Sequence, residues 1–542
     1  MMDSLLNKGQ AMQKVDNTAL QSIRGLTFSS LSYWDIIRFN QFGFGNAELP
    51  DATFVLEAFE KYVRQTPYAT AVTNGEESLS YSQLNDLADC VACELMHRGI
   101  GKGDHIGLFV ERSMYLLVGI LASLKIGATY IPQDVKKAPA SFLEKIVNIA
   151  NPKVVLTTRS SDVQLPQFET AETHNIETLI ARGARHLSNF SPIPKVSEHD
   201  NCFILFTSGT TGTPNGVCVS HKNLSNIIMT QPGDLGIKPG MTVSQLLCIS
   251  FDMSAWEIFG ALCHGATLLL RGSDFQETAS KANVIIATPS ILGRIDPALC
   301  PDVKTVAVAG EPCPRPLADK WSHYSNFYNC CGPTETTIVN TMQLHNAKHR
   351  LTIGKPTPNN TVYILDENMQ PCEIGEVGEM WAGGACVTNG YLKNQTLTAE
   401  RYVRDPFMAD GSLMFRTRDL GRWTEDGELE HLGRTDDQVK VRGFRVELDG
   451  VSKQLESIQG IDLAVTLKLD ERTLISFVSP EKCSEEEGKR FLEDRLPYYS
   501  IPEHIIAMPE LPLTPRGKID KRKLMQQFLD SIASGTHSEG VA

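Results

Sequence analysis

The sequence has no excess of positive charge, because 51 Lys and Arg residues stand against 64 Asp and Glu residues, a formal net charge of -13. This balance argues against nucleic acid or an anionic membrane as the main partner. The N-terminus lacks a basic region followed by an apolar core, so we expect no signal peptide. The longest apolar stretch, 115–131, is interrupted by Ser123, Lys125 and Gly127, which predicts a buried helix leading into a strand. We therefore expect a cytoplasmic protein.

The cysteines form no disulfide framework. There are 13 of them, an odd number scattered along the chain, which favours free thiols in a reducing compartment. Cys90 and Cys93 do form a CxxC pair, but residues 84–96 have the periodicity of an amphipathic helix. We therefore expect this pair to lie on the core face of the helix, with no metal and no redox role.

A chain of 542 residues is too long for one hydrophobic core and should divide into two or three domains. Apolar strand-like runs alternate with helical stretches over 51–435, which predicts an α/β large domain with largely parallel sheets. Shorter strands and two helix candidates predict a small, mobile α+β lid over 436–530. Residues 1–50 show no sustained periodicity and are interpreted as a linker, and 531–542 as a flexible tail.

A glycine- and hydroxyl-rich loop, FTSGTTGTPNG at 206–216, connects two apolar runs. Its glycines allow the backbone to approach an anion closely, and its hydroxyl groups can donate hydrogen bonds to phosphate oxygens. The loop lacks the Gly-Lys-Ser/Thr ending of a Walker A element, so an ordinary P-loop nucleotide hydrolase is excluded. The candidate phosphate-binding residues are Thr207, Ser208, Gly209, Thr210, Thr211 and Gly212.

Further motifs follow this loop along the chain. They are SFDMSAWE at 250–257, NCCGPTETT at 329–337, FRTRDL at 415–420, GRTDDQVKVRGFRVE at 433–447 and PRGKID at 515–520. In order and spacing they resemble the core motifs of the adenylate-forming superfamily, and most closely the amino-acid adenylation domains of non-ribosomal peptide synthetases. The resemblance covers roughly residues 56–524.

This resemblance implies that ATP activates a carboxylic acid: a carboxylate oxygen attacks the α-phosphorus, and pyrophosphate leaves. Two anions meet in that step, so the site needs cations and oriented donors more than it needs a nucleophile. Lys518 in PRGKID is implied to bring its ammonium group between the carboxylate and the α-phosphate. Thr334 is the implied α-phosphate donor, and Glu335 is the implied ligand of Mg²⁺.

The resemblance also assigns the nucleotide contacts. Asp419 occupies the position that binds the ribose hydroxyls, with Arg434 as its companion. Cys331 stands where the family usually has a tyrosine that stacks on adenine, and a base contact of this kind is worth roughly 1 to 3 kcal/mol by analogy with nucleic-acid sites. We therefore expect weaker ATP binding. The other residues expected at the base are Gly310, Glu311, Pro312 and Asn329.

Asp252 matches the family aspartate that pairs with the α-ammonium group of an amino acid in a charge-assisted hydrogen bond. Apart from Asp252 and the backbone, the implied pocket offers nothing to bond a polar side chain, which indicates a hydrophobic amino acid as substrate. Packing residues of a core would have the same composition. The implied walls are Met253, Trp256, Ile286, Ala307, Ala309, Cys330, Ile338 and Val339.

Asp436 occupies the hinge position of the family, and the resemblance implies that the lid turns there after adenylation and withdraws Lys518. The aminoacyl group would then pass to the phosphopantetheine thiol of a carrier protein. No carrier signature follows Leu524, so we expect the acceptor on another chain or a downstream synthetase module. A small helper protein is a further candidate partner.

The chain departs from the family pattern at four places: Asn215 replaces a lysine, Cys331 a tyrosine, Arg418 a glycine, and Asp449-Gly450 the usual Gly-Glu. We interpret the chain as an active enzyme with weaker ATP affinity. Two alternatives stay open. One is an acyl- or aryl-CoA ligase, which Asp252 disfavours, and the other is a catalytically silent scaffold, which only the departures support.

Overall fold

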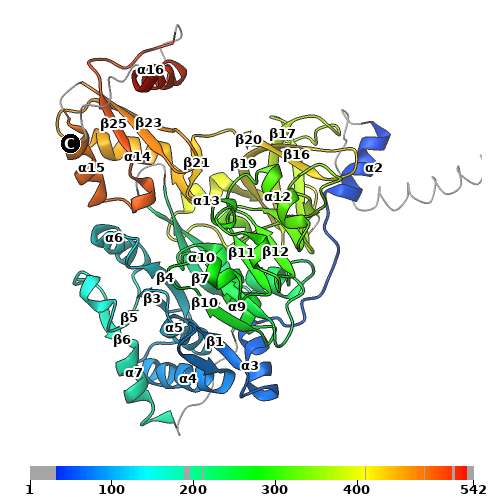
Figure 1. Ribbon diagram of the computed structural model, residues 1–542, viewed down its shortest axis with the longest axis vertical. Coiled ribbons are helices and arrows are strands. Elements are labelled where there is room, and N and C mark those ends of the chain that lie inside the picture. Colours follow the sequence, from blue (N-terminus) through cyan, green and yellow to red (C-terminus); the bar gives the residue numbers. More distant parts are fainter. Residues whose placement is uncertain are drawn as a thin grey trace, which may run out of the picture.

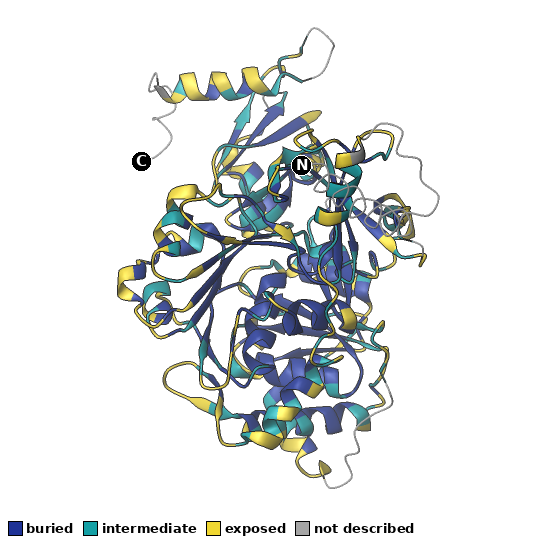
Figure 2. Cartoon of the chain, turned by 90° about the vertical axis from the view of Figure 1, so that its right-hand side faces the viewer, coloured by how far each residue is buried: buried dark blue, intermediate teal, exposed yellow. Residues whose placement is uncertain are grey.

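The computed structural model describes residues 32–187, 196–209, 213–408, 410–480, 483–514 and 519–533. Stacked sheets covered by helices form the body of the molecule, and the C-terminal elements lie together above it (Figure 1). Strand interiors are buried, while the outward faces of the covering helices are exposed (Figure 2). No helix in these ranges is long and apolar enough to cross a membrane. All 13 cysteines are free, as the sequence predicts.

A six-stranded sheet with the order β6-β5-β3-β4-β7-β8 is parallel throughout except for the last pair. Alternate residues of β3 pack on opposite faces, with Leu108 against α5 and Phe109 against α6. The capped helix α4 carries Cys90 and Cys93, both buried as predicted. The elements are α4 (Tyr81–His97), β3 (His105–Val110), α5 (Met114–Lys125), β4 (Thr129–Asp134), α6 (Ala140–Ala150), β5 (Val154–Thr157), β6 (Glu172–Asn175), α7 (Ile176–Gly183), β7 (Asn201–Thr207) and β8 (Asn215–Ser220).

A nine-stranded sheet follows the order β15-β14-β13-β12-β11-β9-β10-β1-β2, with parallel strands in its centre and antiparallel pairs at both edges. One face packs on α9 and the other on α12, whose Trp321 is fully buried. The elements are α3 (Val55–Gln65), β1 (Thr70–Thr73), β2 (Ser78–Ser80), α8 (His221–Met229), β9 (Thr242–Gln245), α9 (Asp252–Leu262), β10 (Thr267–Leu270), α10 (Phe275–Ala279), β11 (Val284–Ala287), α11 (Pro289–Leu292), β12 (Thr305–Val308), α12 (Arg315–Ser322), β13 (Asn326–Cys331), β14 (Thr341–His345) and β15 (Lys355–Pro356).

The third sheet of the body differs from the expectation of largely parallel strands, because all of its pairs are antiparallel. The short turn 424–428 joins β19 directly to β20, and such a connection can only make an antiparallel pair, since a parallel pair needs a long crossover. The elements are β16 (Asn360–Leu365), β17 (Gly378–Gly384), α13 (Gln395–Arg401), β18 (Tyr402–Arg404), β19 (Leu413–Trp423) and β20 (Leu429–Arg434).

The segment interpreted as an irregular linker contains a helix, α2 (Tyr33–Phe42). Ser32 caps it by accepting a hydrogen bond from the Asp35 backbone N–H. Phe39 is buried against Tyr363 of the antiparallel sheet and Phe407 of the loop between β18 and β19. The interpretation of 1–50 as aperiodic is therefore wrong for this stretch, which is too short for its periodicity to stand out. Residues 1–31 lie outside the described part of the chain.

The strands after Arg434 form two small sheets of their own, a two-stranded hairpin and a three-stranded sheet. The three-stranded sheet lies between α14 and α15 on one face and α16 on the other. The expected tail 531–542 starts too early, because α16 runs to Ala533, and 534–542 lie outside the described residues. The elements are β21 (Gln438–Val441), β22 (Phe444–Glu447), α14 (Leu448–Glu456), β23 (Leu463–Lys468), β24 (Leu474–Ser479), α15 (Glu485–Glu493), β25 (His504–Ala507) and α16 (Lys521–Ala533).

Candidate functional site

A cavity of about 660 Å³ lies where the carboxyl ends of β12 and β13 meet the β19–β20 ribbon and the β21–β22 hairpin. Parallel α/β sheets bind their ligands at this end of the strands. Gly310, which follows β12, has φ +87° and so turns the chain in a conformation that glycine adopts without strain. The cavity gathers the residues predicted to contact the nucleoside: Gly310, Glu311, Pro312, Asn329, Cys331, Asp419 and Arg434.

Asp419 lies opposite Arg434 in the register of β19 and β20. Its Oδ1 accepts hydrogen bonds from Arg434 Nη1 at 2.6 Å and from His431 Nε2 at 3.2 Å. Burial works to raise the pKa of Asp419, but His431 and Arg434 outweigh it and lower that pKa. An ionised carboxylate accepts hydrogen bonds from hydroxyl groups, which fits the ribose role predicted for it. Sequence reasoning missed His431.

Glu335 lies in a short 3-10 turn and is completely buried. Arg445 Nη1 is 2.9 Å from its Oε1 and 2.7 Å from its Oε2, and the Tyr391 hydroxyl donates to Oε1 at 2.5 Å. Burial favours the neutral acid, but the Arg445 and Arg401 guanidinium groups and the Tyr391 bond lower the pKa of Glu335 to about 2. Glu335 is therefore ionised and already neutralised by a side chain of the β21–β22 hairpin.

The magnesium role predicted for Glu335 does not fit this arrangement of the chain. A magnesium ion takes oxygen ligands in a near-ideal octahedron, and a guanidinium group contacts both oxygens of the one predicted ligand. Within the described ranges, no group of three or more His, Cys, Asp and Glu side chains could hold a metal ion. The Glu335 carboxylate thus forms an ion pair with the β21–β22 hairpin in this orientation of the lid.

The phosphate loop also contacts the hairpin. Ser208 Oγ donates to the Arg445 carbonyl at 2.9 Å and accepts from the Glu447 backbone N–H at 3.2 Å. A Cβ at Gly209 would lie 2.1 Å from the Thr213 carbonyl oxygen, so the turn admits glycine alone. Thr207 ends β7 and donates to the Asn215 carbonyl at 3.4 Å. Thr210, Thr211 and Gly212 lie outside the described residues.

The hairpin brings two cations into the site. Lys440 and Arg445 are cross-strand partners in the register of β21 and β22, so their side chains share one face. Burial lowers the pKa of Lys440, and the charge of Asp252 opposes that shift. Both residues lie in the motif at 433–447, but neither was predicted to belong to the site. The sequence did contain a signal for this hairpin. A glycine turn lies between two strand-like runs that each contain a cationic residue, directly after the motif predicted to bind the ribose.

Asp252 is the first residue of α9, and its Oδ1 accepts from the Met253 backbone N–H at 2.8 Å. Burial raises the pKa of Asp252, while Lys440 and a hydrogen bond from Thr334 act in the opposite direction. The predicted pocket walls come from α9, from one face of β11 to β13, and from the turn after Glu335. They all belong to one buried cluster: Met253, Trp256, Ile286, Ala307, Ala309, Cys330, Ile338 and Val339.

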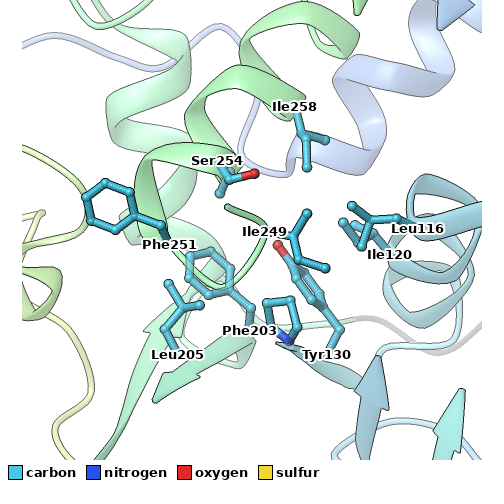
Figure 3. A pocket seen from close by; sticks show the side chains of 11 residues that line it. Leu116, Ile120, Tyr130, Phe203, Leu205, Ile249, Phe251, Ser254 and Ile258 are labelled. Carbon is cyan, nitrogen blue, oxygen red and sulfur yellow. The ribbon is translucent and has the colours of Figure 1, made fainter. Parts of the chain in front are cut away.

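The opposite face of α9 is closely packed (Figure 3). Ser254 and Ile258 point there toward Tyr130, Ile249 and Phe203 around a cavity of about 10 Å³. This space is at the lower limit for one water molecule and cannot hold an acyl group. The tight packing fixes α9 and with it the position of Asp252.

Lys518, the residue predicted to serve the first step, lies outside the described residues. Lys521, which is described and lies close to Lys518 in sequence, pairs through Nζ with Asp437 Oδ2 at 2.6 Å. It therefore contacts the segment between the two domains. The predicted hinge residue Asp436 is bonded by Arg434 through Nε at 2.8 Å and Nη2 at 3.2 Å. One arginine therefore connects the ribose carboxylate to the hinge position.

Comparison with known proteins gives consistent results. The family model described as AMP-binding enzyme matches residues 59–392. Adenylate-forming reductase 06235 of Coprinopsis cinerea is 44% identical over 93% of this chain and 49% of its own length. Gramicidin S synthase 1 of Brevibacillus brevis is 33% identical over 89% of this chain and 45% of its own length. The chain thus spans about half the length of these curated relatives.

Solved structures share the fold. An artificially fused adenylation-PCP di-domain from Klebsiella oxytoca superimposes with a TM-score of 0.74 at 23% identity, over 90% of this chain and 98% of that one. A synthetase protein containing adenylation and PCP domains, bound to a vinylsulfonamide inhibitor, gives a TM-score of 0.76 at 24% identity, over 88% and 84% of the two chains. The predicted α/β fold with a smaller C-terminal part is confirmed.

Proposed function

This chain belongs to the AMP-binding enzyme family, and we propose that it uses ATP to activate a hydrophobic amino acid and transfers the product to a carrier thiol. It is an adenylate-forming enzyme related to non-ribosomal peptide synthetases. The substrate, the carrier and the roles of single residues are the proposed parts.

The position of Asp252 carries the proposal. Its carboxylate lies at the junction of the two parts of the site: it accepts from Thr334 and interacts with Lys440 at the nucleoside cavity, while the next residue of α9, Met253, belongs to the apolar cluster. A buried carboxylate is costly unless a cation or donors compensate it. The α-ammonium group of an amino acid supplies that charge, whereas an acyl or aryl acid brings none.

In the first half-reaction a substrate carboxylate oxygen forms a bond to the α-phosphorus of ATP, and the bond to the pyrophosphate oxygen breaks. Asp419 would hold the ribose, and Thr334 would donate to the α-phosphate. Lys518 would offset the charge where the two anions meet. These residues position and neutralise, so no covalent enzyme intermediate is needed.

In the second half-reaction the sulfur of a thiol bonds to the acyl carbon, AMP leaves with the electron pair of the acyl–oxygen bond, and the thiol proton passes to solvent. The lid orientation seen here suits this stage. Arg445 pairs with Glu335. Ser208 is bonded to β22, so the hairpin takes up a hydroxyl group that a phosphate would otherwise contact. The proposed acceptor is phosphopantetheine on a carrier protein, in line with the adenylation-PCP structures of similar fold.

A second candidate function follows from the relatives called adenylate-forming reductases, which are 44% identical to this chain. In that case the activated acid would be reduced after transfer, and the chain would supply only the adenylating part. The chemistry at the site described here would be the same up to the thioester.

ATP–pyrophosphate exchange tests the proposal, with a panel of apolar, polar and aromatic amino acids and matched acids that lack the amino group. We expect exchange with one or a few apolar amino acids and none with the matched deaminated acids. Lys518→Ala should abolish it, while Lys523→Ala, an exposed neighbour in the same stretch, should not. Exchange with deaminated acids of equal efficiency would replace the amino-acid proposal with that of a general carboxylic-acid ligase.

A further inference from the structure

The residue beside the ribose carboxylate has an uncommon backbone conformation. Arg418 lies between Thr417 and Asp419 in β19 with φ +63°. This left-handed region is disfavoured for residues with a Cβ, and such strain persists where the surroundings hold it in place. Arg418 is also a departure from the family pattern, which has a glycine that would adopt this φ without strain. The side chain therefore needs a use that outweighs the strain.

Arg418 contacts the segment that links β20 to β21 through both backbone and side chain. Its carbonyl accepts from the Thr435 N–H at 2.9 Å and from the Thr435 hydroxyl at 3.2 Å. Its guanidinium Nη1 lies 3.7 Å from Asp436 Oδ2, and Nη2 lies 2.5 Å from Glu400 Oε1. The side chain thus bridges the body of the molecule and the first residues of the lid.

Asp436 completes a continuous row of charges. Arg434 bonds both Asp436 and Asp419, so the order Asp419, Arg434, Asp436, Arg418, Glu400 runs from the ribose position to α13. Burial alone would raise the pKa of Asp436, but Arg434 and then Arg418 lower it. The lowered pKa keeps Asp436 ionised, and each carboxylate of the row faces a guanidinium group.

We propose that Arg418 is a positioning residue that fastens residues 435–436, and with them the lid, in the orientation in which β21–β22 contacts Ser208 and Glu335. The inference rests on the proposed function, because the orientation affects chemistry only if the lid turns between two half-reactions. Arg418 then favours the thiol-transfer orientation over the adenylation orientation. A glycine at this place would keep the backbone bonds to Thr435 but would remove the ion pairs of the Arg418 guanidinium group with Asp436 and Glu400.

Two variants remove the charge and relieve the backbone strain to different degrees. Arg418→Gly removes both, whereas Arg418→Asn removes the charge and keeps a residue that tolerates left-handed φ. The matched control is Lys393→Gly, which relieves an exposed left-handed residue at φ +53° outside the row of charges. The assays are pyrophosphate exchange for the first half-reaction, thioester formation with free pantetheine for the second, and deuterium uptake of peptides within 435–447.

We expect both Arg418 variants to keep or raise pyrophosphate exchange and to lose about two- to fivefold in pantetheine thioester formation, the range that one partly exposed ion pair supports. Deuterium uptake of 435–447 should increase in both, and Lys393→Gly should change neither quantity. Equal changes in the two half-reactions, or unchanged uptake over 435–447, would overturn the role of Arg418. If the unaltered chain shows no exchange with any acid, the proposed function fails, while the uptake data still decide whether Arg418 fastens the segment.

Discussion

The part of the site proposed to hold the nucleotide (the nucleotide part) and the part proposed to hold the acyl group (the acyl part) are held together by different kinds of contact. Around the nucleotide cavity, charged side chains meet matched partners, as Arg434 does with Asp419 and Arg445 with Glu335. In the acyl part, one carboxylate, Asp252, adjoins packed apolar side chains such as Trp256 and Ile286. The charged contacts define which chemistry the site can perform, and the apolar packing defines which substrate fits.

This difference explains what each part can tolerate. Removing one member of a buried ion pair leaves a charge without a partner, which costs far more than the pair contributes. An apolar wall loses only contact area or gains a cavity. Mutations in the nucleotide part should therefore have large and specific effects. Mutations in the acyl part should have effects that increase with the contact area lost.

The largest effect is expected for Arg445→Ala, which leaves the buried Glu335 with the Tyr391 hydroxyl as a hydrogen-bond donor and the more distant charge of Arg401. We expect a loss of about 3 to 5 kcal/mol in the free energy of unfolding, measured by urea titration. Arg442→Ala, in the same hairpin but exposed, is the control and should cost little. The double variant Arg445→Ala/Glu335→Gln should recover most of the loss, and no recovery would show that Arg445 acts through packing instead.

The next prediction compares the two parts directly, by replacing one carboxylate with an amide in each part. Asp252→Asn should raise KM for the amino acid about 10- to 100-fold and leave KM for ATP unchanged, as expected for one charge-assisted hydrogen bond. Asp419→Asn should do the reverse. If both variants raised both constants together, the two parts would be one coupled unit and the comparison would break down.

Sequence reasoning could predict the fold class, and it could propose residues for the nucleotide part because each motif there contains a charged or glycine residue. The predicted nucleoside contacts indeed line one cavity. It missed His431, Lys440 and Arg445 as site residues. Their contacts depend on how the lid lies on the body, and a local motif carries no information on that orientation.

The expectations that failed also have physical reasons. Whether neighbouring strands in 360–434 pair parallel or antiparallel could not be predicted from β16, because it is buried throughout, as a strand of a parallel sheet would be. The helix α2 is short, and its stability comes from Phe39 packing on a distant sheet. The magnesium role of Glu335 stays a prediction; in this orientation of the lid its partner is Arg445, more than a hundred residues away in sequence.

A smaller effect, tighter ATP binding, is expected from Cys331→Tyr in the nucleotide part. This variant restores the aromatic residue of the family pattern. Cys331 lines the cavity, and burial raises the pKa of its thiol to about 12, so it is a neutral side chain at neutral pH. Stacking should lower Kd for ATP about five- to tenfold, which isothermal titration measures. Cys331→Ser is the control and should bring no gain. Weaker binding by the tyrosine variant would mean that the cavity has adapted to the smaller residue.

The last prediction is an effect of pH and concerns a carboxylate on the acyl side that takes no part in the proposed chemistry. Glu257 of α9 is fully buried and accepts from the Leu246 backbone N–H at 2.6 Å. Burial raises its pKa to about 8, although those backbone bonds and Arg112 oppose the shift. Because this pKa lies above the unfolded value of roughly 4.3, the contribution to stability is complete at low pH and is lost as pH rises toward 8.

Glu257→Gln should remove this pH dependence, because glutamine keeps a carbonyl acceptor and does not ionise. The free energy of unfolding of the unaltered chain should fall between pH 5 and 8 by at most about 1.4 kcal/mol per pH unit relative to the variant. The same slope in both proteins would mean that Arg112 keeps Glu257 ionised over the whole range. In that case α9 would carry two buried anions, and Asp252 could no longer be treated as the only charge that the acyl part offers to a substrate.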